Sequence, residues 1–441
     1  MLTMTSYRRE GRRIALLAQY APQDPASPQL ISNHGMHMVE ASLRAAEIPD
    51  LDLHVLDMVE TDLPAVISDL LWLDPDIVGF STYLWSFPFF LEIAQHLKLA
   101  DLSRLIVMGG PSARPSMLNL PPYRESHQYI DALVINEGEL TFLEIVESRD
   151  RSADALGKIS GLALPDNGGW METPARPLGD LNELASPYQM NLAPRGGLGV
   201  LQTYRGCPFT CSFCEWGTLE SPKRVRSVDD LCREFDGMED HDVHGALIVD
   251  AGLNLNQLAF KNMKEAARTT QIFEHRQLIC EVYPAKIQSE HIEFLGTIGQ
   301  PLVGMGLQSF DNEVLAHVER SYDEKQFANH LQQLTDVASV ALEIILGLPG
   351  DGPVNFRRSF ARARTLSCAL RVYHCVVLPS ALMVRAPEHY ALDYDMRSLK
   401  MKACLGWTSQ DLQREIDFLN DQAAQQDGQC GEFFWVFPPP A

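Results

Sequence analysis

The chain has 441 residues, 46% of them hydrophobic, and its 36 basic and 58 acidic residues give a net charge of −22. This length and apolar content predict about two domains with a sizeable core and argue against large-scale disorder. The acidic excess counts against a nucleic-acid partner, because phosphate backbones are bound by basic surfaces.

The N-terminus has basic residues before an apolar run, but that run is too short for a signal peptide. No stretch of eighteen uncharged apolar residues, the length that predicts a transmembrane helix, occurs in the sequence. We therefore expect a cytoplasmic protein that does not contact a membrane. The nine cysteines are odd in number, which argues against a disulfide framework in such a chain.

Residues 1–150 alternate short apolar runs with amphipathic segments. Apolar runs separated by helical patterns are typical of a parallel sheet covered on both faces. We predict an α/β, doubly wound, flavodoxin-like domain here. Its expected strands are Arg13–Gln19, Leu51–Leu56, Ile77–Thr82, Leu105–Gly109 and Ala132–Asn136.

Residues 151–195 lack periodicity and are rich in Pro, Gly and Asp, so we predict a linker. From 196 to 380 the alternation resumes, and six strand–helix units predict a partial (β/α)6 barrel. Residues 381–441 are predicted as a short C-terminal extension. The expected barrel strands are Leu198–Tyr204, Gly245–Asp250, Leu278–Tyr283, Leu302–Gln308, Val340–Leu346 and Val372–Val377.

Three of the nine cysteines form a Cys-x3-Cys-x2-Cys pattern directly after the first expected barrel strand: Cys207, Cys211 and Cys214. Thiolates ligate iron–sulfur clusters, and three ligands leave one iron open. Zinc is the main alternative, but structural zinc takes four ligands, and the next cysteine, Cys232, lies eighteen residues on. Chance clustering of buried thiols is a third possibility.

This pattern, with an aromatic residue before its third cysteine, resembles the radical S-adenosylmethionine (SAM) superfamily. The resemblance implies a [4Fe–4S] cluster whose open iron binds SAM, and cleavage of SAM to a 5′-deoxyadenosyl radical. The segment 304–309 resembles the family's fourth strand, and 343–350 its fifth, where the family usually has Asp at position 343. By this resemblance the SAM contacts would be Phe213, Asp250, Glu281, Gln308, Arg320 and Glu343.

Small or polar residues follow three strands of the first domain, where a doubly wound sheet binds its ligand. These segments resemble the cobalamin-binding domain that precedes the barrel in B12-dependent radical SAM enzymes. By this resemblance the cobalamin contacts would be Ser81, Thr82, Tyr83, Trp85, Gly109, Gly110, Pro111, Ser112, Glu137, Gly138 and Glu139.

Many other B12 proteins carry an Asp-x-His-x-x-Gly loop after the first strand, whose histidine ligates cobalt. That motif is missing here, and His54, which half matches it, lies in the second expected strand. We therefore expect cobalamin to bind base-off, with no protein histidine on cobalt.

The resemblance implies a C-methyltransferase that acts through methylcobalamin on a small natural-product or amino-acid-like metabolite. It also implies an external electron donor such as flavodoxin or ferredoxin. One alternative is a cobalamin radical SAM enzyme that catalyses cyclisation, ring contraction or oxidation without methyl transfer. Another is a corrinoid and Fe–S protein that senses or carries electrons without turnover. No catalytic residue beyond the cofactor contacts is assigned.

Overall fold

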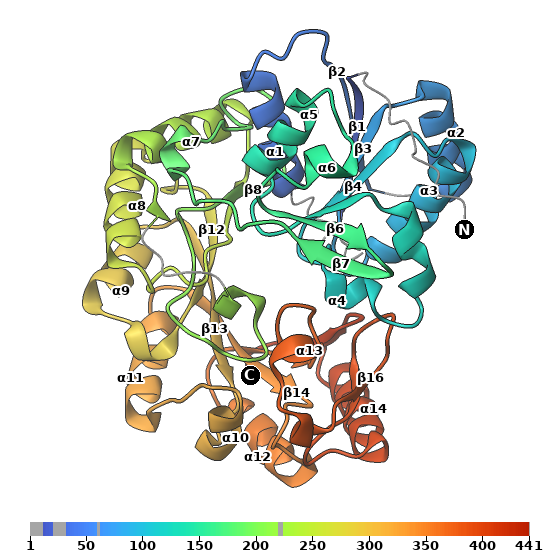
Figure 1. Cartoon of the computed structure of the whole chain (residues 1–441). Helices are drawn as coiled ribbons and strands as arrows, with labels where there is room; N and C mark the ends of the chain where they lie inside the picture. Colours follow the sequence, from blue (N-terminus) through green and yellow to red (C-terminus); the bar gives the residue numbers. More distant parts are fainter. Residues whose placement is uncertain (1–11, 21–31, 60–61, 219–223, 441) are drawn as a thin grey trace. The chain divides into compact units, whose positions relative to one another are not determined.

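The computed structural model describes residues 12–20, 32–59, 62–218 and 224–440 (Figure 1). The chain divides into two units, residues 1–194 and 195–441. None of the helices in the described ranges has both the length and the apolarity needed to cross a bilayer.

The first unit contains a seven-stranded sheet in the order β2-β1-β3-β4-β5-β6-β7. Its first five strands are parallel, and the order 2-1-3-4-5 is that of flavodoxin-like folds, so this prediction is confirmed. The strands are β1 Arg13–Gln19, β2 Asp52–Met58, β3 Ile77–Ser81, β4 Leu105–Gly109 and β5 Ala132–Val134. The helices are α1 His34–Ala45, α2 Leu63–Leu73, α3 Phe87–Ala100, α4 Pro115–Leu118, α5 Glu139–Glu147 and α6 Ala153–Leu156.

The core of this unit forms between the central strands and helices α1 and α5. Strands β1, β3 and β4 are apolar at successive positions because both faces of the sheet are covered. Gly79 on β3 lies so close to Leu16 and Phe142 that any side chain there would collide with both. This glycine therefore lets α5 approach the sheet.

The prediction of a linker at 151–195 is wrong. Strands β6 Leu162–Asp166 and β7 Gly169–Glu172 extend the first sheet as antiparallel neighbours of β5. They are joined through Asn167 and Gly168, both with positive φ, which is the Asn-Gly hairpin signal. The two strands are too short to show periodicity, so the turn was the only local indication of them.

The second unit contains an open eight-stranded sheet in the order β18-β19-β15-β14-β13-β12-β11-β8. Six of these strands are parallel, as predicted for a partial barrel. They are β8 Leu198–Leu201, β11 Gly245–Ile248, β12 Gln277–Val282, β13 Gln300–Gln308, β14 Ser339–Leu346 and β15 Ala369–His374. The larger helices are α7 Val228–Asp240, α8 Gln257–Thr270, α9 Ser289–Leu295, α10 Asn312–His317, α11 Glu324–Thr335 and α12 Pro353–Ala363.

The C-terminal segment, which we predicted as a short extension, adds two strands to the second sheet. Strand β19 Phe434–Phe437 pairs antiparallel with β15, and β18 Gln429–Cys430 pairs with β19. Helix α14 Ser409–Gln425 precedes them, and the short helix α13 Leu382–Arg385 lies earlier in the segment. In Figure 1 helices α13 and α14 are drawn in orange-red and red, and α14 contacts α12 and β19.

Candidate functional site

The loop that carries the three cysteines begins where β8 ends, and Asp250 fixes its first residues. This buried carboxylate accepts hydrogen bonds from the backbone amide (2.8 Å) and hydroxyl (2.5 Å) of Thr203 and from the amide of Tyr204 (3.3 Å). Burial raises the pKa of Asp250 to about 7, although these hydrogen bonds oppose the shift. We predicted that Asp250 contacts SAM. In the structure it accepts the hydrogen bonds that fix the first residues of the cysteine loop.

None of the three cysteines is in a disulfide; Cys211 is buried and the other two are partly accessible. Gly206, with φ of 112°, provides the left-handed conformation that turns the chain into the loop. The amide of Cys214 donates to the carbonyl of Cys211 at 3.1 Å, which closes a tight turn. Burial raises the pKa of Cys207, and the neighbouring Cys211 raises it further.

Three cysteines on one short loop fit the ligand set of a [4Fe–4S] cluster with one open iron. Among the described residues, no three His, Cys, Asp or Glu side chains are grouped as ligands of one metal ion. The cysteines of an iron–sulfur cluster each ligate a different iron, so their sulfurs need not converge on a point. The three cysteines on one short loop therefore suit a [4Fe–4S] cluster with one open iron.

Two arginines flank the cysteine loop. Arg385 of α13 donates to the carbonyls of Thr210 (3.3 Å), Cys211 (3.1 Å) and Cys214 (2.5 Å). Arg320, which follows α10, lies 3.9 Å from the Cys211 sulfur and also donates to a backbone carbonyl of β13. No pattern in the sequence pointed to Arg385, because it lies far along the chain from the cysteines.

Phe209 and Tyr283 form an aromatic pair beside Arg320. The guanidinium of Arg320 lies 4.5 Å from the ring centroid of Tyr283, a cation–π distance. Phe209 of the cysteine loop stacks on the same tyrosine with centroids 4.4 Å apart. The end of β12 is thereby joined to the cysteine loop.

Two carboxylates, Glu281 on β12 and Glu343 on β14, lie on either side of β13. Their partners in register on β13 are Gly304 and Gly306. A side chain at Gly304 would collide with the Glu281 carboxylate, and one at Gly306 would meet the amide of Gln308 and approach Glu343. The glycines therefore make room for polar side chains on the strands beside them.

The carboxylate pair is partly neutralised by the next strand, β15. Arg371 lies 3.6 Å from Glu343, and the hydroxyl of Tyr373 donates to Glu343 at 3.2 Å. Burial raises the pKa of both Glu281 and Glu343, and the charge of Glu343 raises that of Glu281 further, while Arg371 opposes this. With two carboxylates and one strong cation, the pair retains a proton near neutral pH.

Four predicted SAM contacts thus meet around β13: Glu281, Gln308, Arg320 and Glu343. Gln308 ends the strand with φ of 78°, a conformation rare outside glycine and frequent at functional sites. Phe213 is half-buried beside Cys214 in the chain. Asp250 instead bonds to the residues that precede the cysteines.

At the carboxyl edge of the first sheet, two of the predicted cobalamin loops are bonded to each other. The amide and hydroxyl of Thr82 donate to the carbonyl of Gly109 at 2.8 and 2.7 Å, and the amide of Ser112 donates to Thr82 at 3.2 Å. Gly110 has φ of 93°, and a side chain there would strike the Thr82 backbone. These residues form a rigid backbone platform.

Tyr83 and Trp85 stack on this edge with ring centroids 4.6 Å apart and an interplanar angle of 8°. The indole of Trp85 donates to the carbonyl of Gln19 at the end of β1 (3.1 Å), and the residue is 37% exposed. Glu139 is buried in the first turn of α5, after Glu137 and Gly138. A flat, partly exposed aromatic surface of this kind suits a large planar ligand.

A buried polar network, which the sequence did not reveal, lies near the same edge. The ring nitrogens of His37 lie 3.0 Å from Glu40 and 3.1 Å from Asp57, and Tyr20 donates to Asp57 at 2.8 Å. Burial lowers the pKa of His37, but the two carboxylates outweigh it and raise the pKa to about 9. Both ring nitrogens are therefore engaged and not available to a metal. His54 pairs with the adjacent Asp52 at 2.8 Å.

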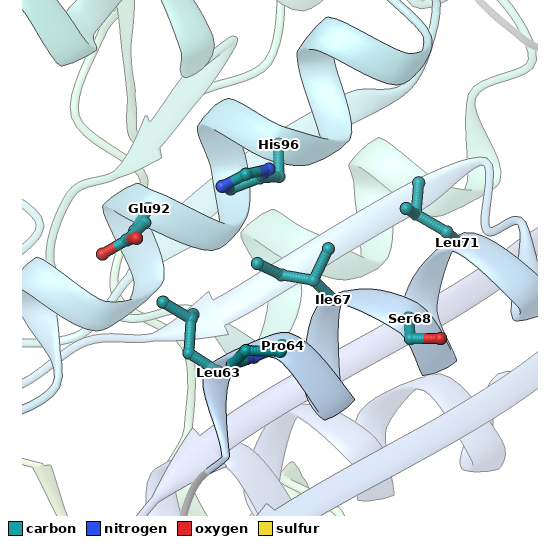
Figure 2. A pocket seen from close by; sticks show the side chains of 7 residues that line it. All are labelled: Leu63, Pro64, Ile67, Ser68, Leu71, Glu92 and His96. Carbon is teal, nitrogen blue, oxygen red and sulfur yellow. The ribbon is translucent and has the colours of Figure 1, made fainter.

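A groove of about 420 Å³ lies elsewhere in the first unit, between α2 and α3. Figure 2 shows Glu92 and His96 of α3 facing Ile67 of α2 across it. Its lining is mostly apolar and, among the described residues, includes none of those predicted to bind a cofactor. The groove is therefore separate from the candidate cobalamin edge.

Comparison with known proteins agrees with this division. Residues 27–146 match the B12 binding domain, and residues 201–362 match the radical SAM superfamily. The chain thus consists of a B12-binding domain followed by a radical SAM domain. This order of domains is the one found in cobalamin-dependent radical SAM enzymes, to which the chain is similar.

Two relatives are methyltransferases. The 2-(S-pantetheinyl)-carbapenam-3-carboxylate methyltransferase of Streptantibioticus cattleyicolor is 27% identical over 74% of this chain and 50% of that protein. The cobalamin-dependent radical SAM methyltransferase TokK of Streptomyces tokunonensis is 27% identical over 70% of this chain and 48% of that protein. The chain therefore spans about half the length of these relatives.

Two solved structures share the fold. The radical SAM methyltransferase TsrM of Kitasatospora setae, with tryptophan and a SAM analogue bound, has a TM-score of 0.66 at 17% identity, covering 84% of this chain and 75% of that one. The cobalamin-dependent radical enzyme OxsB, with aqua-cobalamin and SAM bound, has a TM-score of 0.69 at 15% identity, covering 95% and 67%. At these identities the likeness concerns the fold.

Proposed function

We propose that this protein is a cobalamin-dependent radical SAM C-methyltransferase that acts on a small natural-product or amino-acid-like metabolite. The observation that carries the proposal is the loop of three cysteines outside any disulfide in a chain that also matches the B12 binding domain. The named activities of the two methyltransferase relatives support methyl transfer over other radical chemistry. A carbapenam-type carboxylate is the first substrate class to test.

When bound, the cluster and SAM would supply a carbon radical, and cobalamin would supply a methyl group. Cys207, Cys211 and Cys214 would hold three irons of the cluster. The side chains around β13 would bind SAM, with Glu281 and Glu343 as hydrogen-bonding groups, because their shared proton and Arg371 together balance the charge of the pair. Gln308 and Arg320 would orient that ligand beside the cysteine loop.

The first domain would bind cobalamin at the carboxyl edge of its sheet. The Thr82–Gly110 backbone platform would lie against the ligand, with Tyr83 and Trp85 as the aromatic surface. His37 would not ligate cobalt, because both its ring nitrogens are bonded to carboxylates. Flavodoxin or ferredoxin would supply electrons in the cytoplasm, where thiols stay reduced.

The test is anaerobic reconstitution with iron, sulfide and hydroxocobalamin, followed by counting of iron, sulfide and corrinoid after desalting. We expect about four irons, four sulfides and one corrinoid per chain. Single alanine variants of Cys207, Cys211 and Cys214 should lose iron, whereas Cys430→Ala, at an exposed cysteine, should not.

Turnover is then tested with SAM and a chemical reductant. Corrinoid-dependent formation of S-adenosylhomocysteine, with a CH2 added to the product mass, is the expected result. A product without added mass would indicate the cyclisation, ring-contraction or oxidation chemistry instead. A protein that holds both cofactors but never consumes SAM would contradict an enzymatic role and indicate a sensor or electron carrier.

A further inference from the structure

The C-terminal segment reaches the cysteine loop through Arg385. Three backbone carbonyls of the loop, those of Thr210, Cys211 and Cys214, accept hydrogen bonds from its two terminal nitrogens. Carbonyls that converge on one guanidinium cannot move independently of one another. Arg385 therefore fixes the relative positions of two of the three cysteines.

The segment around Arg385 is itself anchored on both sides. The amide of Ser380 donates to Glu215, the residue after the third cysteine, at 3.0 Å. The hydroxyl of Tyr390 donates to the carbonyl of His317, shortly before Arg320, at 2.6 Å. The guanidinium is thus held against the loop from a segment that lies outside the matched radical SAM region.

Two polar atoms at this place lack a partner among the described residues: the hydroxyl of Ser212 and Nε of Arg385. Ser212 is 5% exposed and lies between Cys211 and Cys214. A buried donor without a partner costs free energy, so such groups usually meet a water, an ion or a ligand. The sulfurs of a cluster ligated by this loop are acceptors that would satisfy them.

We propose that Arg385 positions the cysteine loop and that Arg385 and Ser212 together donate hydrogen bonds to the sulfurs of the cluster. This inference rests on the proposed function, since it requires the cluster. A positive charge and donors beside a cluster stabilise its reduced, more negative state and so raise its reduction potential. Arg385 is a positioning residue, because it acts through the loop and the cluster.

The experiment compares reconstituted wild-type protein with Arg385→Gln, Arg385→Lys and Ser212→Ala. The cluster potential is measured by an EPR-monitored redox titration, and iron retention is followed during dialysis. The matched control is Arg364→Gln, because Arg364 likewise donates to a backbone carbonyl (that of Pro438, 2.6 Å) but not to one of the cysteine loop. Thermal unfolding of each variant reports on its folding.

We expect Arg385→Gln to shift the reduction equilibrium about tenfold toward the oxidised cluster, about 59 mV for one electron, and to lose iron faster. Arg385→Lys should keep most of the potential but lose iron faster, because an ammonium cannot bridge the three carbonyls in the same way. Ser212→Ala should lower the potential with wild-type iron retention, and the control should match wild type in both.

Wild-type potentials in both Arg385→Gln and Ser212→Ala would overturn this inference and leave the proposed function intact. A wild-type protein that binds no cluster would overturn both. If Arg385→Gln does not fold, the reduction potential of Ser212→Ala and the iron retention of Arg385→Lys still test this inference.

Discussion

The hydroxyl of Tyr373 donates a hydrogen bond of 3.2 Å to Glu343 on the adjacent strand of the second sheet. Glu343 in turn faces Glu281 across two glycines of β13, with Arg371 as the nearby cation. The interior of the sheet therefore holds a proton-sharing acidic pair. This pair makes the stability of the second unit dependent on pH.

Glu281→Gln should change that pH dependence. The folded-state pKa of Glu281 lies above its ordinary value of 4.5, so its contribution to stability is full below about pH 4.5 and is lost as pH rises through the folded pKa. The glutamine stays neutral at every pH. Relative to wild type, we expect the variant to gain roughly 1 kcal/mol between pH 5 and pH 9, measured by urea unfolding. Glu293→Gln, at an exposed position on α9, is the control and should show no such gain.

Asp250→Ala should destabilise the second unit by about 2–4 kcal/mol, because it leaves the buried amides of Thr203 and Tyr204 without an acceptor. Asp250→Asn keeps a carbonyl acceptor and should cost less than half as much. The folded pKa of about 7 lies above the ordinary 3.8, so the wild-type contribution from this proton declines between about pH 4 and 7. The Asn variant should lack that decline. Equal losses of stability in the two variants would contradict the role of Asp250 as the acceptor for these amides.

His37→Asn should destabilise the first unit by about 3 kcal/mol at pH 7, because it leaves Asp57 and Glu40 without their buried cation. The folded pKa of about 9 lies above the ordinary 6.5, so this contribution is full below about pH 6.5 and is lost as pH rises through 9. The difference from wild type should therefore shrink toward pH 10. His54→Asn, which removes an exposed pair, should cost less than about 1 kcal/mol.

Trp85→Ala should weaken corrinoid retention about tenfold, equivalent to ~1.4 kcal/mol, because it removes half of the stacked pair at the sheet edge. The measurement is the corrinoid absorbance that remains after repeated desalting. Trp72→Ala is the matched control, since Trp72 is 88% exposed on α2 in the same unit. Equal corrinoid loss in the two variants would remove Trp85 from the candidate site.

Local patterns in the sequence determined the parts of the structure that depend on neighbouring residues. The central strands β1, β3 and β4 were visible as apolar runs because both of their faces are buried. The cysteine loop was visible because three cysteines lie within eight residues. The hairpin of β6 and β7 was missed because its strands are too short for their periodicity to be read.

The sequence by itself determined the two-domain order, the cysteine site and most of the strands. Only the tertiary structure decided which distant residues serve those sites: Arg385 meets Cys214 from 171 residues away, and β19 joins the sheet edge beside β15. It also decided that Asp250 supports the cysteine loop. These contacts follow from strand order and packing, and residues brought together by packing leave no periodic signal in the chain.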